Sequence, residues 1–277
     1  MKKILVTTDL SDNSKSGIKF AIALAAQGNF ELTFFHIYNS SLPTGWSNSK
    51  KMSFQNEMTN KTQQSLESFV NKLCKGINLK NNKISYVIEN SAFIDPTIIE
   101  YASENKFDFI CCSTRGAGQF ERFFGTNTAN LIINSKVPVI AVPHNYKTKI
   151  IKNILYASDV VNLKIELKKV VSFAKILNST VELLHFVNPY ESADSKIIET
   201  AVKKLTRFDV KMSIKTRDPI HTLVADIEDA IKSVNPGLLV MFTDINRSIF
   251  QRILLSSKSA DYAYNPKVPL LVFNNAE

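Results

Sequence analysis

The chain repeats itself, and this duplication is the strongest constraint on its fold. Three segments of the first copy return in the second in the same order: KKILVTTDL (2–10) as KNILYASDV (152–160), LTFFHI (32–37) as VELLHF (181–186), and KVPVIAV (136–142) as KVPLLVF (267–273). A repeat this long is too long for a solenoid. The pattern therefore predicts two copies of one domain, which we place at residues 1–148 and 149–277.

Within each copy, short apolar runs alternate with segments of helical periodicity. In the first copy we expect strands at residues 4–6, 32–37, 84–88, 107–112 and 137–142. We expect helices that begin at Ser11 or Asp12 and at residues 54–73, 96–105 and 126–134. The second copy has a similar helical stripe, made by Leu167, Val170, Val171 and Ala174. This alternation predicts two doubly wound α/β domains, each with a parallel sheet covered by helices on both faces.

Composition limits where the protein works. No apolar run approaches the roughly 18 residues of a membrane helix, and the apolar run after the two N-terminal lysines is too short for a signal peptide. The three cysteines are too few for a disulfide framework or a zinc site. We therefore expect a cytoplasmic protein with no membrane partner. The net charge of +9 is spread over both copies and gives only weak support to nucleic-acid binding.

Two loops of the first copy carry candidate binding residues. Ligands of open parallel sheets bind beyond the carboxyl ends of the strands, where the strand order reverses. One such loop holds Thr8 and Asp9, and the other reads STRGAGQFERFFGTNT at residues 113–128. Its glycines allow close backbone approach, Arg115 adds a fixed charge, and Thr126 and Thr128 could cap a helix whose free amides face an anion. Spacing alone leaves phosphate binding and a merely tight loop equally open.

These segments together resemble the universal stress protein family over nearly the whole chain, as a tandem pair. The resemblance rests on the Thr7-Thr8-Asp9 opening, the Phe35-His36-Ile37 strand end, the glycine loop and the two Val-Pro strands. It implies five-stranded sheets of order 3-2-1-4-5 that pair through their fifth strands, so that the chain is similar to a fused dimer that could dimerise further. It also implies an adenine-nucleotide site in the first domain, held by Thr8, Asp9, Ile37, Ser113, Arg115, Gly116, Gly125, Thr126 and Asn127.

By the same resemblance, Asp9 would hold the ribose or adenine side, and the backbone near Ile37 would meet the adenine. Gly116, Gly125, Thr126 and Asn127 would surround the phosphates. For Asp9, a helix N-terminal charge remains an equally good interpretation.

The glycine loop departs from the Gly-x2-Gly-x9-Gly-Ser/Thr pattern of the nucleotide-binding family members in two ways. Ser113 stands where the first glycine would be, and only eight residues separate Gly116 from Gly125. Either change can move the amide donors away from a triphosphate.

The second copy lacks the glycine loop of the first. Ser158 and Asp159 correspond to Thr8 and Asp9, but the loop at residues 242–257 contains no glycine and includes Asp244, which would repel a phosphate. We predict that the second copy binds no nucleotide by the family's mode.

Other candidate residues have simpler interpretations. His36 and His185 end equivalent strands without a catalytic partner in sequence, so we interpret each as a partly buried residue at the edge of its sheet. We interpret Cys111 and Cys112 as core residues. Trp46 in the long polar connection of residues 39–53 is a lid over the crevice, a partner contact or a loop anchor, and the sequence leaves the three open. Because nucleophile-elbow, P-loop and paired-carboxylate motifs are absent, we expect no catalysis beyond slow ATP hydrolysis.

The leading hypothesis is a stress-response sensor or adaptor that binds ATP or AMP in its first domain, with Mg²⁺ accompanying ATP, and that recognises a protein partner. The alternative is a scaffold of the same fold that binds no nucleotide and recognises a protein partner or another small ligand. Nucleic-acid binding, which rests only on the net charge, ranks last.

Overall fold

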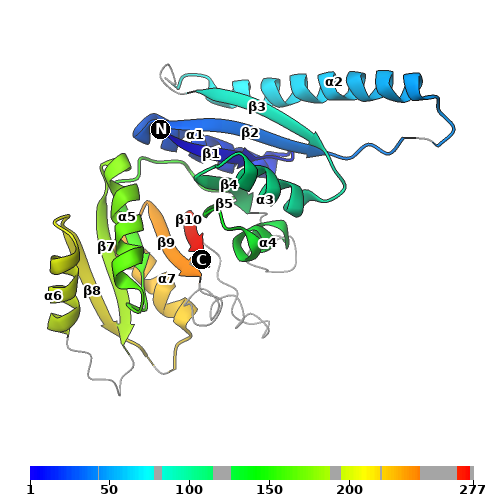
Figure 1. The fold of residues 1–277 in the computed structure, drawn as a ribbon. Helices are drawn as coiled ribbons and strands as arrows, with labels where there is room; N and C mark the ends of the chain where they lie inside the picture. Colours follow the sequence, from blue (N-terminus) through cyan, green and yellow to red (C-terminus); the bar gives the residue numbers. More distant parts are fainter. Residues whose placement is uncertain are drawn as a thin grey trace. The chain divides into compact units, whose positions relative to one another are not determined.

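The computed structural model describes residues 1–42, 44–77, 83–114, 126–187, 195–218, 220–243 and 267–274. The chain divides into two compact units, one made mainly by residues 1–148 and the other mainly by residues 149–277. Both units alternate strands with helices (Figure 1). The exact boundary after Thr148 stays a prediction.

A parallel sheet forms the centre of the first unit. Its strands lie in the order β3-β2-β1-β4-β5, and the pairings of β1 with β2 and β4 and of β2 with β3 are parallel. The strands are β1 (Lys2–Thr7), β2 (Phe30–Tyr38), β3 (Ile84–Asn90), β4 (Phe109–Thr114) and β5 (Val139–Pro143). The fold class and the 3-2-1-4-5 order are confirmed. The predicted pairing of the two fifth strands concerns both units and stays a prediction.

Helices cover both faces of this sheet. A short 3₁₀ turn, η1 (Asp12–Ser14), leads into α1 (Lys15–Gly28), which packs with α2 (Asn48–Cys74) on one face. The other face carries α3 (Ile94–Glu104) and α4 (Thr126–Asn134) (Figure 1). The predicted stripe of α1 is fully buried and consists of Ile18, Ala21, Ile22 and Ala25. Burial of this stripe removes apolar surface from water and holds the helix on the sheet.

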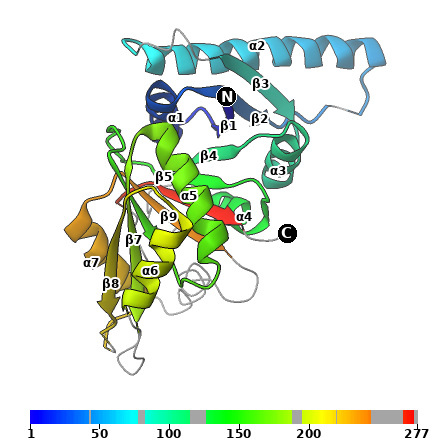
Figure 2. The ribbon, with the colours of Figure 1, turned by 60° about the vertical axis from the view of Figure 1, so that its left-hand side comes forward.

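The second unit has the same topology. Its strands are β6 (Asn153–Ala157), β7 (Thr180–Val187), β8 (Val210–Thr216), β9 (Leu238–Thr243) and β10 (Leu270–Asn274), in the order β8-β7-β6-β9-β10. Its helices are α5 (Leu163–Leu177), α6 (Ser195–Leu205) and α7 (Leu223–Val234). Figure 2 shows α5 and α6 on one face of this sheet. The predicted stripe of α5 is buried, which confirms it.

Several predicted element ends are wrong by a few residues, for local reasons. Helix α2 begins at Asn48, six residues before the predicted start, because the Ser47 side chain caps it by accepting a 3.4 Å hydrogen bond from the Lys50 amide. Strand β4 begins at Phe109, since the amide of Phe107 still bonds to the Ala102 carbonyl at the end of α3. The predicted helix start at Ser11 or Asp12 becomes η1, and α1 follows from Lys15.

Two equivalent histidines, His36 and His185, connect the second strand of each unit to the loop that follows the first strand. The Nδ1 atom of His36 lies 2.8 Å from the Thr8 carbonyl oxygen, and that of His185 lies 2.9 Å from the Ser158 carbonyl oxygen. A carbonyl only accepts, so Nδ1 carries the proton in both rings. This geometry supports a structural role for each histidine, as predicted.

Of the helices in the described part of the chain, none combines the length and the hydrophobicity that crossing a bilayer requires.

Candidate functional site

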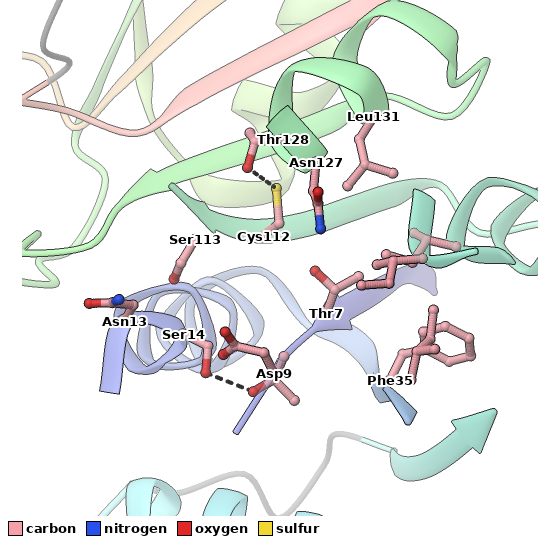
Figure 3. Close-up of a pocket in the computed structure, with 14 residues that line it drawn as sticks. Thr7, Asp9, Asn13, Ser14, Phe35, Cys112, Ser113, Asn127, Thr128 and Leu131 are labelled. Atoms are coloured by element: carbon pink, nitrogen blue, oxygen red, sulfur yellow. Dashed lines mark hydrogen bonds between the residues drawn. The ribbon is translucent and has the colours of Figure 1, made fainter. Parts of the chain in front are cut away.

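A pocket opens at the carboxyl edge of the first sheet, between the ends of β1 and β4. After β1 the chain crosses to α1 on one face, and after β4 it crosses to α4 on the other. This divergence is the topological switch point at which open α/β sheets bind ligands. The pocket has a volume of about 160 Å³ and is lined by Thr7, Thr8, Asp9, Asn13, Ser14, Phe35, Ile37, Ile94, Ile98, Cys112, Ser113, Asn127, Thr128 and Leu131 (Figure 3).

The loop after β1 forms a tight turn held by its own side chains. Leu10 has a φ of 61°, a left-handed conformation that costs a non-glycine residue free energy. The turn is held because the Leu10 amide donates to the Thr8 hydroxyl at 3.0 Å, and that hydroxyl lies 2.8 Å from the Ser14 hydroxyl. Thr8 is buried, and its amide bonds to the Phe35 carbonyl oxygen at 3.0 Å. The loop is therefore fixed before any ligand arrives.

The Asp9 carboxylate is oriented by the next serine. Its Oδ1 atom accepts from the Ser11 amide at 3.0 Å and from the Ser11 hydroxyl at 2.6 Å. Partial burial raises the pKa of Asp9, but the hydrogen bonds from Ser11 and Ser14 outweigh burial, so the pKa lies below its ordinary value. Asp9 is thus ionised at neutral pH and can accept a hydrogen bond from a ligand hydroxyl or amine.

One wall of the pocket is apolar. It is made by side chains of β2, α3 and α4, namely Phe35, Ile37, Ile94, Ile98 and Leu131. Phe35, Ile98 and Leu131 are buried, whereas Ile94 is exposed, with 47% of its surface accessible. A wall of this kind favours a flat apolar or aromatic group, and the polar side chains opposite fix its orientation.

The Ser113 side chain holds α1 against the end of β4. Its Oγ atom accepts a 2.7 Å hydrogen bond from the Gly17 amide and lies 3.3 Å from the Ser16 hydroxyl. A Cβ atom at Gly17 would lie 2.8 Å from this Oγ and 3.0 Å from the Ser113 backbone nitrogen, so only glycine fits there. Ser113 lines the pocket, as predicted, but its hydroxyl oxygen already accepts a hydrogen bond from the backbone of α1.

Helix α4 brings an amide and a hydroxyl to the same pocket. Asn127 lies in its first turn, close to the end of β4 in Figure 3. Thr128 is 5% exposed and lies within the helix, where its hydroxyl is 3.9 Å from the Cys112 sulfur. The expectation that Thr128 caps α4 is wrong, because the helix already begins at Thr126.

Buried thiols lie behind the site. Burial raises the pKa of Cys112 to about 12, although the hydrogen bond to Thr128 lowers it in part. Burial also raises the pKa of Cys111, whose sulfur lies 3.6 Å from the Gly17 carbonyl oxygen. Both thiols are therefore neutral core groups at physiological pH.

Five of the nine predicted binding residues meet in this pocket: Thr8, Asp9, Ile37, Ser113 and Asn127. Arg115, Gly116 and Gly125 lie outside the described residues. Thr126 is the first residue of α4, and its side chain is not among those that the structure describes. Sequence reasoning missed Thr7, Asn13 and Ser14, although the polar run after Asp9 carries a signal for the last two, because it directly follows a strand end.

Trp46 is not among the residues that line the pocket. Its ring packs edge-to-face on Phe54 of α2, with 5.3 Å between the ring centroids, and the Lys50 ammonium lies 4.6 Å from the Trp46 ring centre. These contacts support the loop-anchor interpretation.

The second unit places large side chains where the first has small ones. Register puts Tyr156 at the position of Val6 and Phe242 at the position of Ser113. The Tyr156 hydroxyl donates to the buried Glu166 carboxylate and accepts from the Ser158 hydroxyl at 2.9 Å. The Phe242 ring lies 5.7 Å from the Tyr156 ring and 4.9 Å from the Phe273 ring. These contacts fill the central strand ends and support the prediction that this copy does not bind a nucleotide by the same mode. Residues 244–257 of its loop lie outside the described residues.

Metal binding has little support within the described residues. No three His, Cys, Asp or Glu side chains gather there in a group that could hold an ion. Asp9 is the one carboxylate among the lining residues of the pocket, and its Oδ1 already accepts two hydrogen bonds.

Fold and site together define a tandem, doubly wound α/β protein with a pocket of about 160 Å³ at the switch point of its first unit. The model of the "Universal stress protein family" matches residues 1–143. The chain belongs to the universal stress protein family. Because both units share one topology, it is a tandem member, as the resemblance implied.

Several solved structures match the fold along nearly the whole chain. A universal stress protein from Archaeoglobus fulgidus DSM 4304 is 17% identical, with a TM-score of 0.67 and coverage of 99% of this chain and 98% of its own. A putative universal stress protein from Pseudomonas aeruginosa UCBPP-PA14 is 13% identical, with a TM-score of 0.61 and coverage of 99% and 93%. A comparison with curated proteins gives no match.

Proposed function

We propose that the first unit binds an adenine nucleotide, ATP or AMP, and that the protein works in the cytoplasm as a stress-response sensor or adaptor. The observation that carries this proposal is the convergence of Thr8, Asp9, Ser113 and Asn127 on one pocket that also has an apolar wall. These groups come from strand ends and a helix start that are far apart in sequence. Their convergence matches the needs of a ligand with a flat base, hydroxyl groups and an anionic end.

Each part of the pocket has a role in this proposal. The base would pack on the wall formed by Ile37, Ile94 and Ile98, with the backbone near Ile37 meeting its polar edge. The ionised Asp9 would accept from a ribose hydroxyl. The start of α4, with Thr126 and Asn127, would face the phosphates because the free amides of a helix N-terminus attract anions. Arg115, Gly116 and Gly125 would complete the phosphate side.

The size of the pocket limits how a nucleotide can lie in it. Its volume of about 160 Å³ is smaller than the roughly 300–1,000 Å³ of pockets that enclose a drug-sized ligand. A nucleotide held here would keep part of its surface outside the enclosed space. If Mg²⁺ takes part, the phosphates of ATP would supply most of its ligands, because Asp9 is the one carboxylate among the described residues of the lining.

Among its described residues, the proposed site contains no pair of groups arranged for catalysis. The Asp9 carboxylate is ionised and engaged with Ser11, and the Cys112 thiol is neutral. His36 donates its Nδ1 proton to a backbone carbonyl. We therefore propose binding without efficient turnover, with hydrolysis of ATP at most slow.

Isothermal titration calorimetry with ATP and with AMP tests the proposal, with and without Mg²⁺. Asp9→Ala should weaken binding about tenfold or more, because it removes a charged acceptor from the site. Gly125→Glu should abolish binding by placing a carboxylate in the predicted phosphate loop. The matched control is Asp159→Ala, which removes the corresponding carboxylate of the second unit and should leave binding unchanged. Absence of binding heat for the parent protein would overturn the proposal.

The alternative function is a scaffold that recognises a protein partner or another small ligand without nucleotide. The commitment of the Ser113 hydroxyl to the Gly17 amide favours it, since the backbone there carries a side chain in place of the family's glycine. Partner capture that is unchanged by ATP, AMP or Asp9→Ala would support this alternative.

A further inference from the structure

A second hollow lies on the other side of the turn that holds Asp9. It has a volume of about 410 Å³ and is open to solvent along helix α2. Its lining residues are Leu10, Lys61, Gln64, Ser65, Ser68, Phe69 and Lys72. We call this hollow the α2 groove. None of its lining residues takes part in the nucleotide pocket.

The α2 groove follows one face of a helix. Lys61, the adjacent pair Gln64 and Ser65, Ser68 and Lys72 follow one another at intervals of three or four residues, which places them on one stripe of α2. All five are exposed. Leu10 and Phe69 are half-buried and supply the apolar part of the groove. The stripe therefore combines two cations at its ends, uncharged polar groups between them, and an apolar patch beside them.

The α2 groove carries a net positive charge. The described residues that line it include two lysines and no acidic residue. Within the described part of the chain, neither ammonium forms an ion pair. Glu67 accepts from Gln63 at 2.8 Å, and Asp12 pairs with Lys15 at 2.6 Å. Lys15 lies over the Phe69 ring, 6.0 Å from its centre, so this ion pair borders the groove without adding net charge. Glu57 lies one turn before Lys61, beyond the end of the lining.

The spacing of the two lysines selects the shape of an anionic partner. They are eleven residues apart in α2, which at a rise of about 1.5 Å per residue separates their backbone positions by about 16 Å. An extended chain rises about 3.3 Å per residue and points successive side chains to opposite faces, so two side chains on one face and four residues apart are separated by about 13 Å. The long, flexible lysine side chains bridge the remaining difference. Two separate carboxylates on an extended segment therefore match the lysines better than one compact anion does.

We propose that the α2 groove binds an extended acidic segment of a partner protein. Carboxylates at positions i and i+4 of that segment pair with Lys61 and Lys72, and an apolar side chain at i+2, on the same face, contacts Leu10 and Phe69. Gln64, Ser65 and Ser68 offer hydrogen-bonding groups to the segment's backbone. The proposal does not depend on nucleotide binding, since the two sites share no lining residue.

Fluorescence anisotropy with a labelled eight-residue peptide tests this proposal on the full-length protein. The peptide carries glutamates four positions apart and a leucine midway between them in a serine and glycine background. One matched peptide replaces both glutamates by glutamine, and another places the glutamates two positions apart. We expect the first peptide to bind about tenfold more tightly than either, because two exposed ion pairs each contribute up to about 1 kcal/mol.

Charge-reversal variants locate the binding surface. Lys61→Glu with Lys72→Glu should weaken peptide binding about tenfold or more. The control pair is Lys164→Glu with Lys168→Glu on α5 of the second unit, which changes the net charge equally at exposed lysines outside the groove and should change affinity less than about twofold. The neutral pair Lys61→Gln with Lys72→Gln should give an intermediate loss, and it removes the risk that repulsion unfolds α2.

Three outcomes would overturn the proposal: no binding by the parent protein, equal loss in the control pair, or equal binding of the glutamine peptide. A further experiment uses inorganic phosphate as a competitor of the peptide. Displacement of the peptide by phosphate beyond the effect of an equal ionic strength of chloride would show a compact anion site and would contradict the extended-segment proposal.

Discussion

The backbone amide of Gly17, in the first turn of α1, donates a 2.7 Å hydrogen bond to the side-chain hydroxyl of Ser113 at the end of β4. This contact joins two segments that are 96 residues apart in sequence. It fixes the start of α1 against the sheet beside the pocket, so the contact bears on both stability and the site.

Gly17→Ala should destabilise the first unit by about 1–3 kcal/mol, because overpacking a close contact forces the backbone to move. The added methyl would lie 2.8 Å from the Ser113 Oγ and 3.2 Å from the Cys112 carbonyl carbon. Urea denaturation followed by circular dichroism measures the loss. Gly45→Ala is the control, since an added Cβ there meets nothing within 4 Å. Equal stability of Gly17→Ala and the parent would contradict the close approach.

Ser113→Ala should lower the free energy of unfolding by about 1–2 kcal/mol, because it leaves the Gly17 amide without its acceptor in a partly buried place. Ser113→Thr keeps the hydroxyl and should lose less. The comparison is made by urea denaturation at pH 7. A loss that is the same in both variants would show that packing, and not the hydrogen bond, determines the effect.

Alkaline pH should destabilise the second unit through Tyr156. Burial raises its pKa far above the ordinary value, and the neighbouring Glu166 carboxylate raises it further. Above about pH 10 the unfolded chain loses this proton while the folded chain keeps it. The unfolded state then binds fewer protons, so stability falls as pH rises.

Tyr156→Phe should flatten this alkaline decrease, measured as the difference in unfolding free energy between pH 8 and pH 11. At neutral pH the same variant should cost about 1–3 kcal/mol, since Glu166 and Ser158 lose their shared partner. Tyr146, whose pKa burial raises to about 12, titrates in both proteins and cancels in the comparison. An unchanged alkaline decrease in the variant would assign the effect to other tyrosines.

Thiol labelling should separate the three cysteines. Cys74 is partly exposed, whereas Cys111 and Cys112 are buried and their thiols stay neutral. We expect iodoacetamide at pH 8 to modify Cys74 alone in the folded protein and all three cysteines in denaturant, as measured by mass spectrometry. Cys74→Ser is the control and should show no label when folded. Fast labelling of Cys112 would mean that the pocket opens far enough to expose this buried thiol to solvent.

Nucleotide titration of the full-length protein should give one site per chain if the proposed function is correct. The second unit has Phe242 at the position of Ser113 and Tyr156 beside it. An aromatic ring thus replaces a small hydroxyl side chain that lines the first pocket, which favours a single nucleotide site. Calorimetry measures the stoichiometry directly, and two equivalent sites would contradict this interpretation.

Periodicity predicted most of the fold because core packing imposes it on the sequence. The apolar stripes of α1 and α5 and the continuous apolar runs of the strands needed no tertiary information. Element ends were less predictable. The start of α2 depends on a capping contact at Ser47, and its first turns carry few apolar residues that would have revealed a helix. The candidate site was predicted where it follows strand ends, as for Thr8, Asp9 and Ser113.

The sequence by itself determined that the chain is a duplicated, doubly wound α/β protein, and that the polar residues after β1 and β4 lie at the same edge of the first sheet. Alternation and strand direction are enough for that conclusion. Only the tertiary structure showed that the Ser113 hydroxyl serves Gly17, that Tyr156 shares its hydroxyl with Glu166 and Ser158, and that Leu10 borders a basic groove on α2. Such contacts depend on packing distances between segments far apart in sequence, and periodicity does not encode those distances.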